Sequence, residues 1–198
     1  MAHHGREMIA AQFRDTENVI GDMAADKDLL AKLAGVADLW INSIKAGGKI
    51  MLAGNGGSAA DAQHVAGELV NRFNFDRPAI AGLALSTDTS VLTCIGNDSD
   101  FNEVFSRQIE ALGRADDIFC AISTSGNSKN ILRAIEAAKA RGITVVGFTG
   151  RKGGAMVELC DHCIQIPHNA TPRIQEGHLC CYHAISAIVE DRLYGKNA

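Results

Sequence analysis

The chain has 198 residues, of which 46% are hydrophobic and 21% are charged, and its formal net charge is −4. This composition is too apolar for a disordered chain and too charged for a bundle of membrane helices. The length is typical of one domain with a buried core, so we expect a single domain over residues 1–198. Phosphate backbones are bound by clustered Lys and Arg, and the mild acidity therefore argues against nucleic acid as the main ligand.

The sequence shows no targeting or membrane signal. No segment reaches the ~18 consecutive apolar residues of a membrane span, and the first residues lack the charged-then-apolar order of a signal peptide. We therefore expect no membrane partner and a cytoplasmic protein whose six cysteines are reduced thiols. Cys160 and Cys163 form a Cys-x-x-Cys pair, but a structural zinc site normally needs a second pair. We interpret them as small buried hydrophobic residues, with a metal or redox pair as the alternative.

The first 47 residues predict two helices. In the second, Asp26 is a candidate N-cap, apolar residues recur at helical spacing from Leu29 to Ile44, and Gly47-Gly48 ends the pattern. Such a long helical segment before the first strand is unusual for a doubly wound domain. We predict that residues 1–47 pack against another subunit, while residues 48–198 form an α/β core with a C-terminal helix.

Five short apolar runs follow, with helical patterns between them and after the last. Apolar runs without polar alternation, separated by helices, are typical of a parallel sheet covered on both faces. We therefore predict a three-layer α/β fold with a five-stranded parallel sheet, and ligands at the carboxyl ends of its strands. The predicted strands are residues 49–53, 79–85, 117–122, 143–148 and 163–166, and the final helix covers about 173–194.

Two small, hydroxyl-bearing loops follow the first and third predicted strands, at residues 54–61 and 123–128. Glycine lets the backbone approach a ligand, and a helix N-terminus offers free N–H groups to an anion. The hydroxyl groups favour a phosphate monoester over the alternative that both loops are only tight turns. Neither loop has the Gly-Lys-Ser/Thr end of a nucleoside-triphosphate loop, which argues against ATP. The hydroxyl side chains of the second loop are Ser123, Thr124, Ser125 and Ser128.

Gly54, Gly56 and Ala59 also match the degenerate fingerprint of a dinucleotide-binding loop. In that motif an acidic residue follows the glycines by ~20 residues and binds the ribose. The nearest acid after the second predicted strand is Asp88, more than thirty residues beyond Gly54. A nicotinamide cofactor is therefore the minor alternative.

The helix after the first loop carries His64 and Glu68 at positions i and i+4, and hence on one face. Such a pair can ligate one divalent ion or act as acid and base, or it can be a simple surface pair. The position of this helix directly after the loop favours the functional interpretation. On the last helix, His178 and His183 are five residues apart and do not share a face, so at most one should belong to a given site.

Five motifs occur in order along the chain: residues 54–58, His64-x-x-x-Glu68, Gly96-Asn97-Asp98, residues 123–128 and residues 173–183. Together they resemble the motifs of the phosphoheptose isomerases, also called sedoheptulose 7-phosphate isomerases, which have the sugar isomerase (SIS) fold. The resemblance runs from about residue 26 to residue 194 and is far more specific than any single motif. It implies a flavodoxin-like three-layer sandwich with an N-terminal helical extension.

The resemblance also implies a cytoplasmic homotetramer with sites at its subunit interfaces. The implied reaction converts D-sedoheptulose 7-phosphate into D-glycero-D-manno-heptose 7-phosphate, the first step toward ADP- or GDP-heptose for lipopolysaccharide core or related glycans. One zinc per site is implied, with His64, Glu68, Gln175 and His183 as ligands. The implied substrate contacts are Asn55, Gly56, Gly57, Glu68, Asn97, Asp98 and Gln175 at the sugar, Ser123, Thr124, Ser125 and Ser128 at the phosphate, and Arg72 as a further candidate.

Aldose–ketose isomerisation needs a base for a C–H proton, an acid for the oxygens and an electrophile for the developing charge. We assign Glu68 as the base and His183 as its acid–base partner, with zinc polarising the oxygens. Eight residues of helix separate Gln175 from His183, about 12 Å at 1.5 Å per residue, which strains two side chains that reach one ion from a single straight helix. Either Gln175 lies in a frayed helix start or neighbouring chains share the site, and we favour the shared site.

A non-catalytic alternative comes from the same fold. An SIS protein that binds the bacterial replication initiator lacks the Glu of the second motif and the last His of the final motif. This chain has Glu68 and His183, which favours an enzyme over a scaffold. A sugar-phosphate sensor would need a DNA-binding domain, for which the chain has no room. Some phosphoheptose isomerases have Asp where this chain has Pro172, so we expect no sugar contact from that position.

Overall fold

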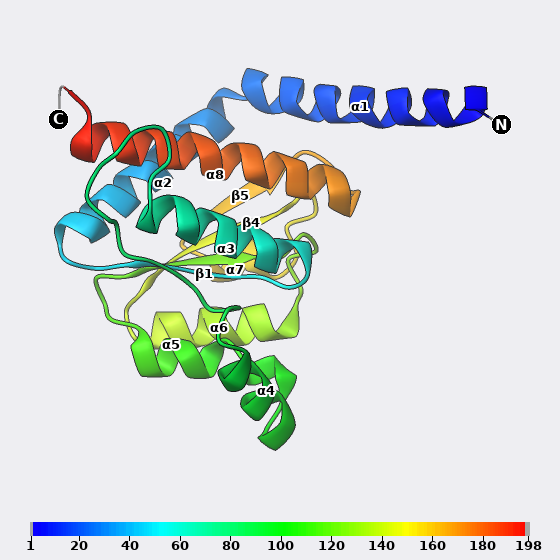
Figure 1. Cartoon of the computed structure of the whole chain (residues 1–198). Helices are drawn as coiled ribbons and strands as arrows, with labels where there is room; N and C mark the ends of the chain where they lie inside the picture. Colours follow the sequence, from blue (N-terminus) through cyan, green and yellow to red (C-terminus); the bar gives the residue numbers. More distant parts are fainter. Residues whose placement is uncertain (1, 197–198) are drawn as a thin grey trace.

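The five apolar runs form the central sheet of the computed structural model, which describes residues 2–196 (Figure 1). Every strand pairing is parallel, and the strand order is β2-β1-β3-β4-β5. The prediction of a five-stranded parallel sheet is confirmed, although the second strand is shorter than residues 79–85. The strands are β1 (Ile50–Ala53), β2 (Gly82–Ala84), β3 (Ile118–Ile122), β4 (Thr144–Gly150) and β5 (His162–Ile166).

Helices cover both faces of this sheet (Figure 1). Strand side chains alternate between two apolar clusters, because successive residues of a strand point to opposite faces. Ile50 and Leu52 join the cluster that contains Trp40 and Tyr182, whereas Met51 joins the opposite cluster. The first cluster lies under α1 (Ala2–Ala25), α2 (Lys27–Lys45), α3 (Gly57–Val70) and α8 (Thr171–Tyr194), and the second under α5 (Ser106–Leu112) and α6 (Lys129–Ala140). The remaining helical segments are α4 (Thr89–Asp98), a 3₁₀ turn at Phe101–Glu103 and α7 (Met156–Leu159).

The strand order reverses direction between β1 and β3. The chain moves from β1 outward to β2, returns to pair β3 with β1, and then continues outward to β5. In open α/β sheets, ligands gather at the carboxyl ends of the strands on either side of such a switch point. Both predicted ligand loops, residues 54–61 and 123–128, start at these two strand ends, and the first is shorter than predicted because α3 begins at Gly57.

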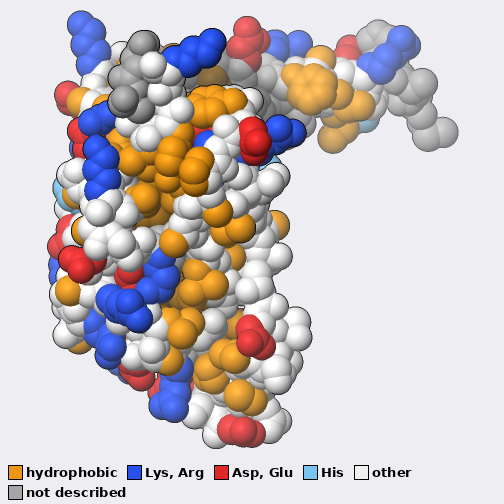
Figure 2. Space-filling view, turned by 60° about the vertical axis from the view of Figure 1, so that its left-hand side comes forward, with side chains coloured by type: hydrophobic (Ala, Val, Ile, Leu, Met, Phe, Trp, Pro, Cys, Tyr) orange, Lys and Arg blue, Asp and Glu red, His pale blue; other side chains and the backbone are white. Residues whose placement is uncertain are grey.

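The N-terminal helices form as predicted. Asp26 caps α2 by accepting hydrogen bonds from the backbone N–H groups of Asp28 and Leu29, both at 3.0 Å. The N-terminal part of α1 projects beyond the body and carries a patch of hydrophobic side chains (Figures 1 and 2). Ile9 is 56% exposed and Phe13 is 71% exposed. This apolar surface has no covering element within the described residues.

One buried carboxylate links the amino ends of two central strands of the sheet. Asp117, which is 1% exposed, lies directly before β3. It accepts backbone hydrogen bonds from Lys49 at 2.9 Å and Arg114 at 2.8 Å, and it pairs with Nζ of Lys49 at 2.5 Å. We call these groups the Asp117 clamp. The clamp ties the start of β1 to the start of β3, at the edge opposite the ligand loops.

The cysteines of the described residues are free thiols, and none is in a disulfide. Burial raises the pKa of Cys160 to about 12 and that of Cys163 to about 11, which keeps both protonated at neutral pH. Reactive redox cysteines are thiolates, so these values argue against a redox pair. Both side chains are half-buried, which fits the interpretation as small hydrophobic residues only in part. Separately, none of the helices within residues 2–196 is long and apolar enough to cross a membrane.

Candidate functional site

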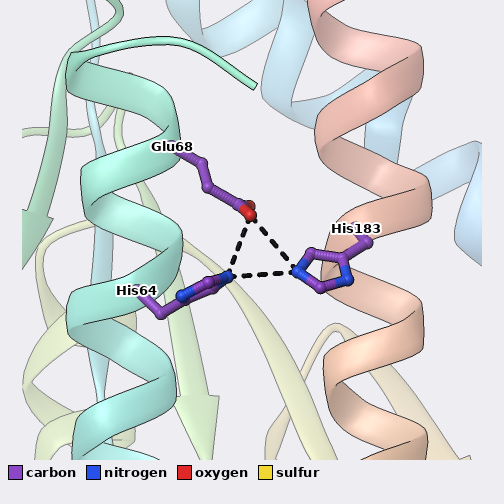
Figure 3. Close-up of side chains that lie close together, drawn as sticks. All are labelled: His64, Glu68 and His183. Atoms are coloured by element: carbon purple, nitrogen blue, oxygen red, sulfur yellow. Dashed lines mark hydrogen bonds and ion pairs between the residues drawn. The ribbon is translucent and has the colours of Figure 1, made fainter. Parts of the chain in front are cut away.

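Three side chains predicted as metal ligands meet between α3 and α8 (Figure 3). The Nε2 atom of His64 lies 2.9 Å from Oε1 of Glu68, and the Nε2 atom of His183 lies 3.2 Å from the same oxygen. The two Nε2 atoms are 3.1 Å apart. Two imidazole nitrogens and one carboxylate oxygen therefore point at a common centre, and we call these residues the His/Glu cluster.

The cluster forms because α3 and α8 run side by side in the same direction. Gly57 at the start of α3 lies against Gln175 at the start of α8, while Glu68 meets His183 farther along. On α3, His64 and Glu68 share a face because they are four residues apart. His183 is placed opposite that face by the packing of α8, at a sequence separation of 119 residues from His64.

The cluster fits a divalent transition metal. Imidazole nitrogen and carboxylate oxygen are ordinary zinc donors, and a catalytic zinc keeps one position open beside three protein ligands. Oε2 of Glu68 is buried and has no hydrogen-bond partner among the described residues, and the two facing imidazole nitrogens have only each other and Oε1. A cation between these atoms would satisfy their lone pairs. The side chains of His64 and His183 are 50% and 38% exposed, so the centre is open to a ligand.

Gln175, the fourth predicted ligand, contacts the start of α3. A Cβ atom on Gly57 would be 2.4 Å from Nε2 of Gln175. The side-chain amide of Gln175 therefore lies against residues 54–57, which we call the glycine loop. Gln175 is the fifth residue of α8, which is already helical from Thr171, so a frayed helix start is not the explanation. Eight helical residues place it about 12 Å from His183 along the axis. Its roles as zinc ligand and sugar contact stay predictions.

A pair of side-chain amides links the glycine loop to α6. Asn55, Gly56 and Gly57 are exposed, and Gly56 has a φ of +56°, a conformation that favours glycine. Asn55 exchanges two hydrogen bonds with Asn130 of α6, at 2.9 and 2.8 Å. The sequence reasoning missed Asn130. Its only signal is that a polar residue lies in the first helical turn after residues 123–128, which we call the hydroxyl loop. The pair links the two loops across the switch point.

The hydroxyl loop is partly ordered by its own side chains. Ser123 is buried and lies 2.8 Å from Oγ of Ser128 and 3.4 Å from Oγ of Ser125. Thr124 is half-buried and Ser125 is exposed, so both are accessible from outside. Ser128 precedes α6 without capping it, which leaves the first N–H groups of that helix open to an anion. The arrangement suits a phosphate group.

Three other predicted contacts lie apart from the cluster. Asn97 and Asp98 end α4, which has no buried residue and hangs below the sheet in Figure 1. Their side chains bond to each other, from Nδ2 to Oδ1 at 2.7 Å, and no described contact joins them to the cluster. Arg72 is exposed, beyond the end of α3. The substrate roles of these residues stay predictions.

Of the two histidines on α8, only His183 belongs to the cluster, as predicted. His178 is fully buried, and its Nε2 atom lies 3.1 Å from the carbonyl oxygen of Thr149. Burial lowers the pKa of His178 to about 4, so it is neutral at physiological pH. We therefore assign it to the core.

Asp61 is a further titratable group near the cluster that the motifs did not single out. It lies one turn before His64 on α3, and its Oδ2 atom is buried without a partner among the described residues. Burial raises the pKa of Asp61, and the charge of His64 works in the opposite direction. Its i−3 spacing from His64 is the signal that sequence reasoning could have used.

Comparison with known proteins gives consistent similarities. Residues 15–150 match the SIS domain family. The chain is 53% identical to a phosphoheptose isomerase from Burkholderia pseudomallei over 188 residues, covering 95% of each chain. It is 52% identical to phosphoheptose isomerase 2 from Campylobacter jejuni, covering 95% of this chain and 94% of the relative. The solved structure of a phosphoheptose isomerase from Neisseria gonorrhoeae superposes with a TM-score of 0.88 at 41% identity, covering 94% of this chain and 98% of that one.

Proposed function

Because the chain belongs to the phosphoheptose isomerases, which have the SIS fold, we propose that it converts D-sedoheptulose 7-phosphate into D-glycero-D-manno-heptose 7-phosphate. The observation that carries the proposal is the convergence of His64, Glu68 and His183 on one centre. A non-catalytic SIS scaffold has no need of this donor set. The product would enter the synthesis of ADP- or GDP-heptose for lipopolysaccharide core or related glycans.

We propose zinc as the cofactor, held by His64, Glu68 and His183, with Gln175 from a neighbouring chain. When bound, the ion would polarise the carbonyl and hydroxyl oxygens of the sugar and stabilise the charge of an enediolate. The donor types and the unpartnered Oε2 of Glu68 support this choice.

Proton transfer is the task of the cluster's own side chains. Glu68 takes the proton from the carbon next to the carbonyl group and returns it to the neighbouring carbon. Its two oxygens allow a division of roles, because Oε1 faces the imidazoles while Oε2 has no partner among the described residues. His183 serves the substrate oxygens as acid and base.

We further propose that the complete site combines residues of neighbouring chains in a cytoplasmic homotetramer. Within one chain, Glu68 lies eleven helical residues beyond Gly57, about 16 Å along α3. The glycine loop and the His/Glu cluster of the same chain are therefore separated. The two imidazole side chains are also partly exposed, so a neighbouring chain can reach the cluster. The exposed Ile9 and Phe13 of α1 support the use of residues 1–47 in assembly.

The test is turnover of sedoheptulose 7-phosphate by the purified protein, followed as loss of the ketose and gain of the aldose. We expect turnover that a chelator abolishes and that added zinc restores. Protein that shows no turnover with zinc fully loaded would contradict the proposed reaction. Turnover that persists after complete metal removal would leave the isomerase assignment standing but overturn the role of zinc.

A further inference from the structure

A buried ion pair lies behind the His/Glu cluster. Arg77, in the segment between α3 and β2, places Nε 3.2 Å from Oε1 of Glu190 on α8. Their side chains are 2% and 1% exposed. Replacing a buried ion pair by apolar residues is often neutral or stabilising, so its presence is weak support for a role in stability alone. A role in fixing geometry is therefore worth examining.

Glu190 fixes the segment that follows α3. Besides Arg77, its carboxylate accepts the backbone N–H of Phe73 at 2.8 Å and that of Asn74 at 2.6 Å. Burial acts to raise the pKa of Glu190, but these two N–H donors and Arg77 outweigh it and hold the pKa below its ordinary value. The carboxylate is thus charged at neutral pH and fully engaged. We call Glu190, Arg77 and the two N–H groups the Glu190 clamp.

Arg77 connects the Glu190 clamp to the main chain of Glu68, one of the cluster residues. Its Nη2 atom donates to the carbonyl oxygen of Glu68 at 2.7 Å, and its Nη1 atom donates to those of Leu69 at 2.7 Å and Pro78 at 2.9 Å. The last carbonyl groups of a helix have no partner within the helix. Arg77 therefore supplies partners at the end of α3 and fixes the main chain of Glu68 itself.

Phe73 carries the clamp to the other side of the cluster. Its ring stacks on that of His183, with a centroid distance of 5.5 Å and an interplanar angle of 28°. A metal-binding histidine usually donates its second ring nitrogen to a carboxylate or carbonyl group, which fixes the ring. The described residues offer no such partner to Nδ1 of His183. The contact with Phe73 is therefore what the chain provides to orient this imidazole.

We propose that the Arg77–Glu190 pair positions two residues for metal binding and catalysis: Glu68 directly, and His183 through the ring of Phe73. The pair reaches Glu68 through its carbonyl oxygen and His183 through the stacked ring, so it sets the distance between two side chains on different helices. Arg77, Glu190 and Phe73 are positioning residues. This inference rests on the proposed function of the cluster as a zinc site.

The test compares three variants with a matched control. Glu190→Gln removes the charge that holds the clamp, Phe73→Leu removes the stacked ring, and Phe73→Tyr keeps it. Asp117→Asn is the control, because Asp117 also accepts two backbone N–H groups and pairs with a basic side chain, at the opposite edge of the sheet. For each protein we would measure zinc affinity by competition with a chromogenic chelator, thermal unfolding, and kcat and KM separately.

We expect zinc affinity to fall by about 10- to 100-fold in Glu190→Gln and by about 10-fold in Phe73→Leu, the range seen when groups that orient metal ligands are lost. Phe73→Tyr should restore it, and Asp117→Asn should keep it. The activity loss should appear in kcat, with KM little changed, since the clamp does not touch the substrate.

The inference is overturned if Phe73→Leu and Glu190→Gln bind zinc as tightly as the wild type, or if Asp117→Asn loses as much affinity as Glu190→Gln. Should Glu190→Gln fail to fold, the Phe73→Leu and Phe73→Tyr pair still decides. A wild type that binds no zinc also overturns it. A wild type that binds zinc but does not turn over the heptose phosphate contradicts the proposed function alone, because the affinities are measured without substrate.

Discussion

Two buried carboxylates, Asp117 and Glu190, solve the same chemical problem at two places in the molecule. Each is 1% exposed, and each accepts two backbone N–H groups and pairs with one basic side chain. Asp117 joins the starts of two strands, where no functional side chain lies nearby. Glu190 joins the end of α3 to α8, where the clamped segment contacts Glu68 and His183.

The two clamps use the same kinds of hydrogen bond and ion pair but connect different segments of the chain. A buried carboxylate that collects N–H groups is a general way to fix a chain where regular hydrogen bonding ends. At the amino edge of the sheet this serves only the fold. Beside the cluster it also sets the geometry of a site, and experiments on the two clamps can separate these contributions.

The largest effect is expected at the site itself. Glu68→Gln should lower turnover by about 1,000-fold or more, because an amide cannot take the C–H proton and general bases contribute about 10²–10⁴-fold. Thermal unfolding should change little, since the substitution preserves shape. The measurement is kcat at saturating zinc and substrate. Glu136→Gln, at an exposed carboxylate of α6, is the matched control, and near-normal turnover by Glu68→Gln would remove Glu68 from the catalytic pair.

The second prediction compares the stabilities of the two clamps. Glu190→Gln should lower the free energy of unfolding by about 3 kcal/mol, because it leaves the buried guanidinium of Arg77 without its partner. Asp117→Asn should lower it by about 2 kcal/mol, because Lys49 is 22% exposed and its ammonium group can be solvated once the charge of Asp117 is lost. Urea unfolding at pH 7 measures both. The activity per folded molecule should fall only in Glu190→Gln. Equal loss of activity in both variants would mean that the Glu190 clamp acts through stability alone.

The smallest effect is a pH dependence that comes from the core beside the cluster. His178 has a pKa of about 4 in the folded protein against an ordinary value of 6.5, so the unfolded chain binds the proton more readily between these values. Stability must therefore fall as the pH is lowered through this range. From pH 7 to 5.5 the loss should be about 1 kcal/mol, calculated from the two pKa values.

His178→Leu should remove this part of the slope, whatever its effect on the stability at pH 7. The measurement is urea unfolding of both proteins at the two pH values. The lowered pKa of Glu190 contributes in the same direction but closer to pH 4, so it leaves the comparison above pH 5.5 nearly unaffected. A variant with the wild-type slope would contradict the assignment of His178 as a buried neutral residue.

Much of the fold was predictable because its signals are local. Parallel strands buried on both faces appear as short continuous apolar runs, and Asp26 marks the start of α2 as an N-cap does. The second strand was overestimated because Ala79 and Ile80 continue the apolar run without pairing with β1. The N–H of Ile80 donates instead to the carbonyl oxygen of Leu69 at 3.0 Å, at the end of α3.

The site was predictable only in part, for a physical reason. The i, i+4 spacing of His64 and Glu68 on one helix indicated a candidate pair, and the resemblance of the motifs indicated His183. The clamp gives no such signal, because Arg77 and Glu190 are 113 residues apart and meet only when α3 and α8 pack together. The Asn55–Asn130 pair is hidden in the same way.

The central claim is that one ion is held by His64, Glu68 and His183, and the X-ray absorption spectrum of the zinc-loaded protein tests it most directly. We expect nitrogen and oxygen scatterers at about 2.0–2.2 Å, with the multiple-scattering signature of two imidazoles. In His183→Ala that signature should fall to one imidazole. Sulfur neighbours at about 2.3 Å, or a spectrum unchanged in His183→Ala, would contradict the account.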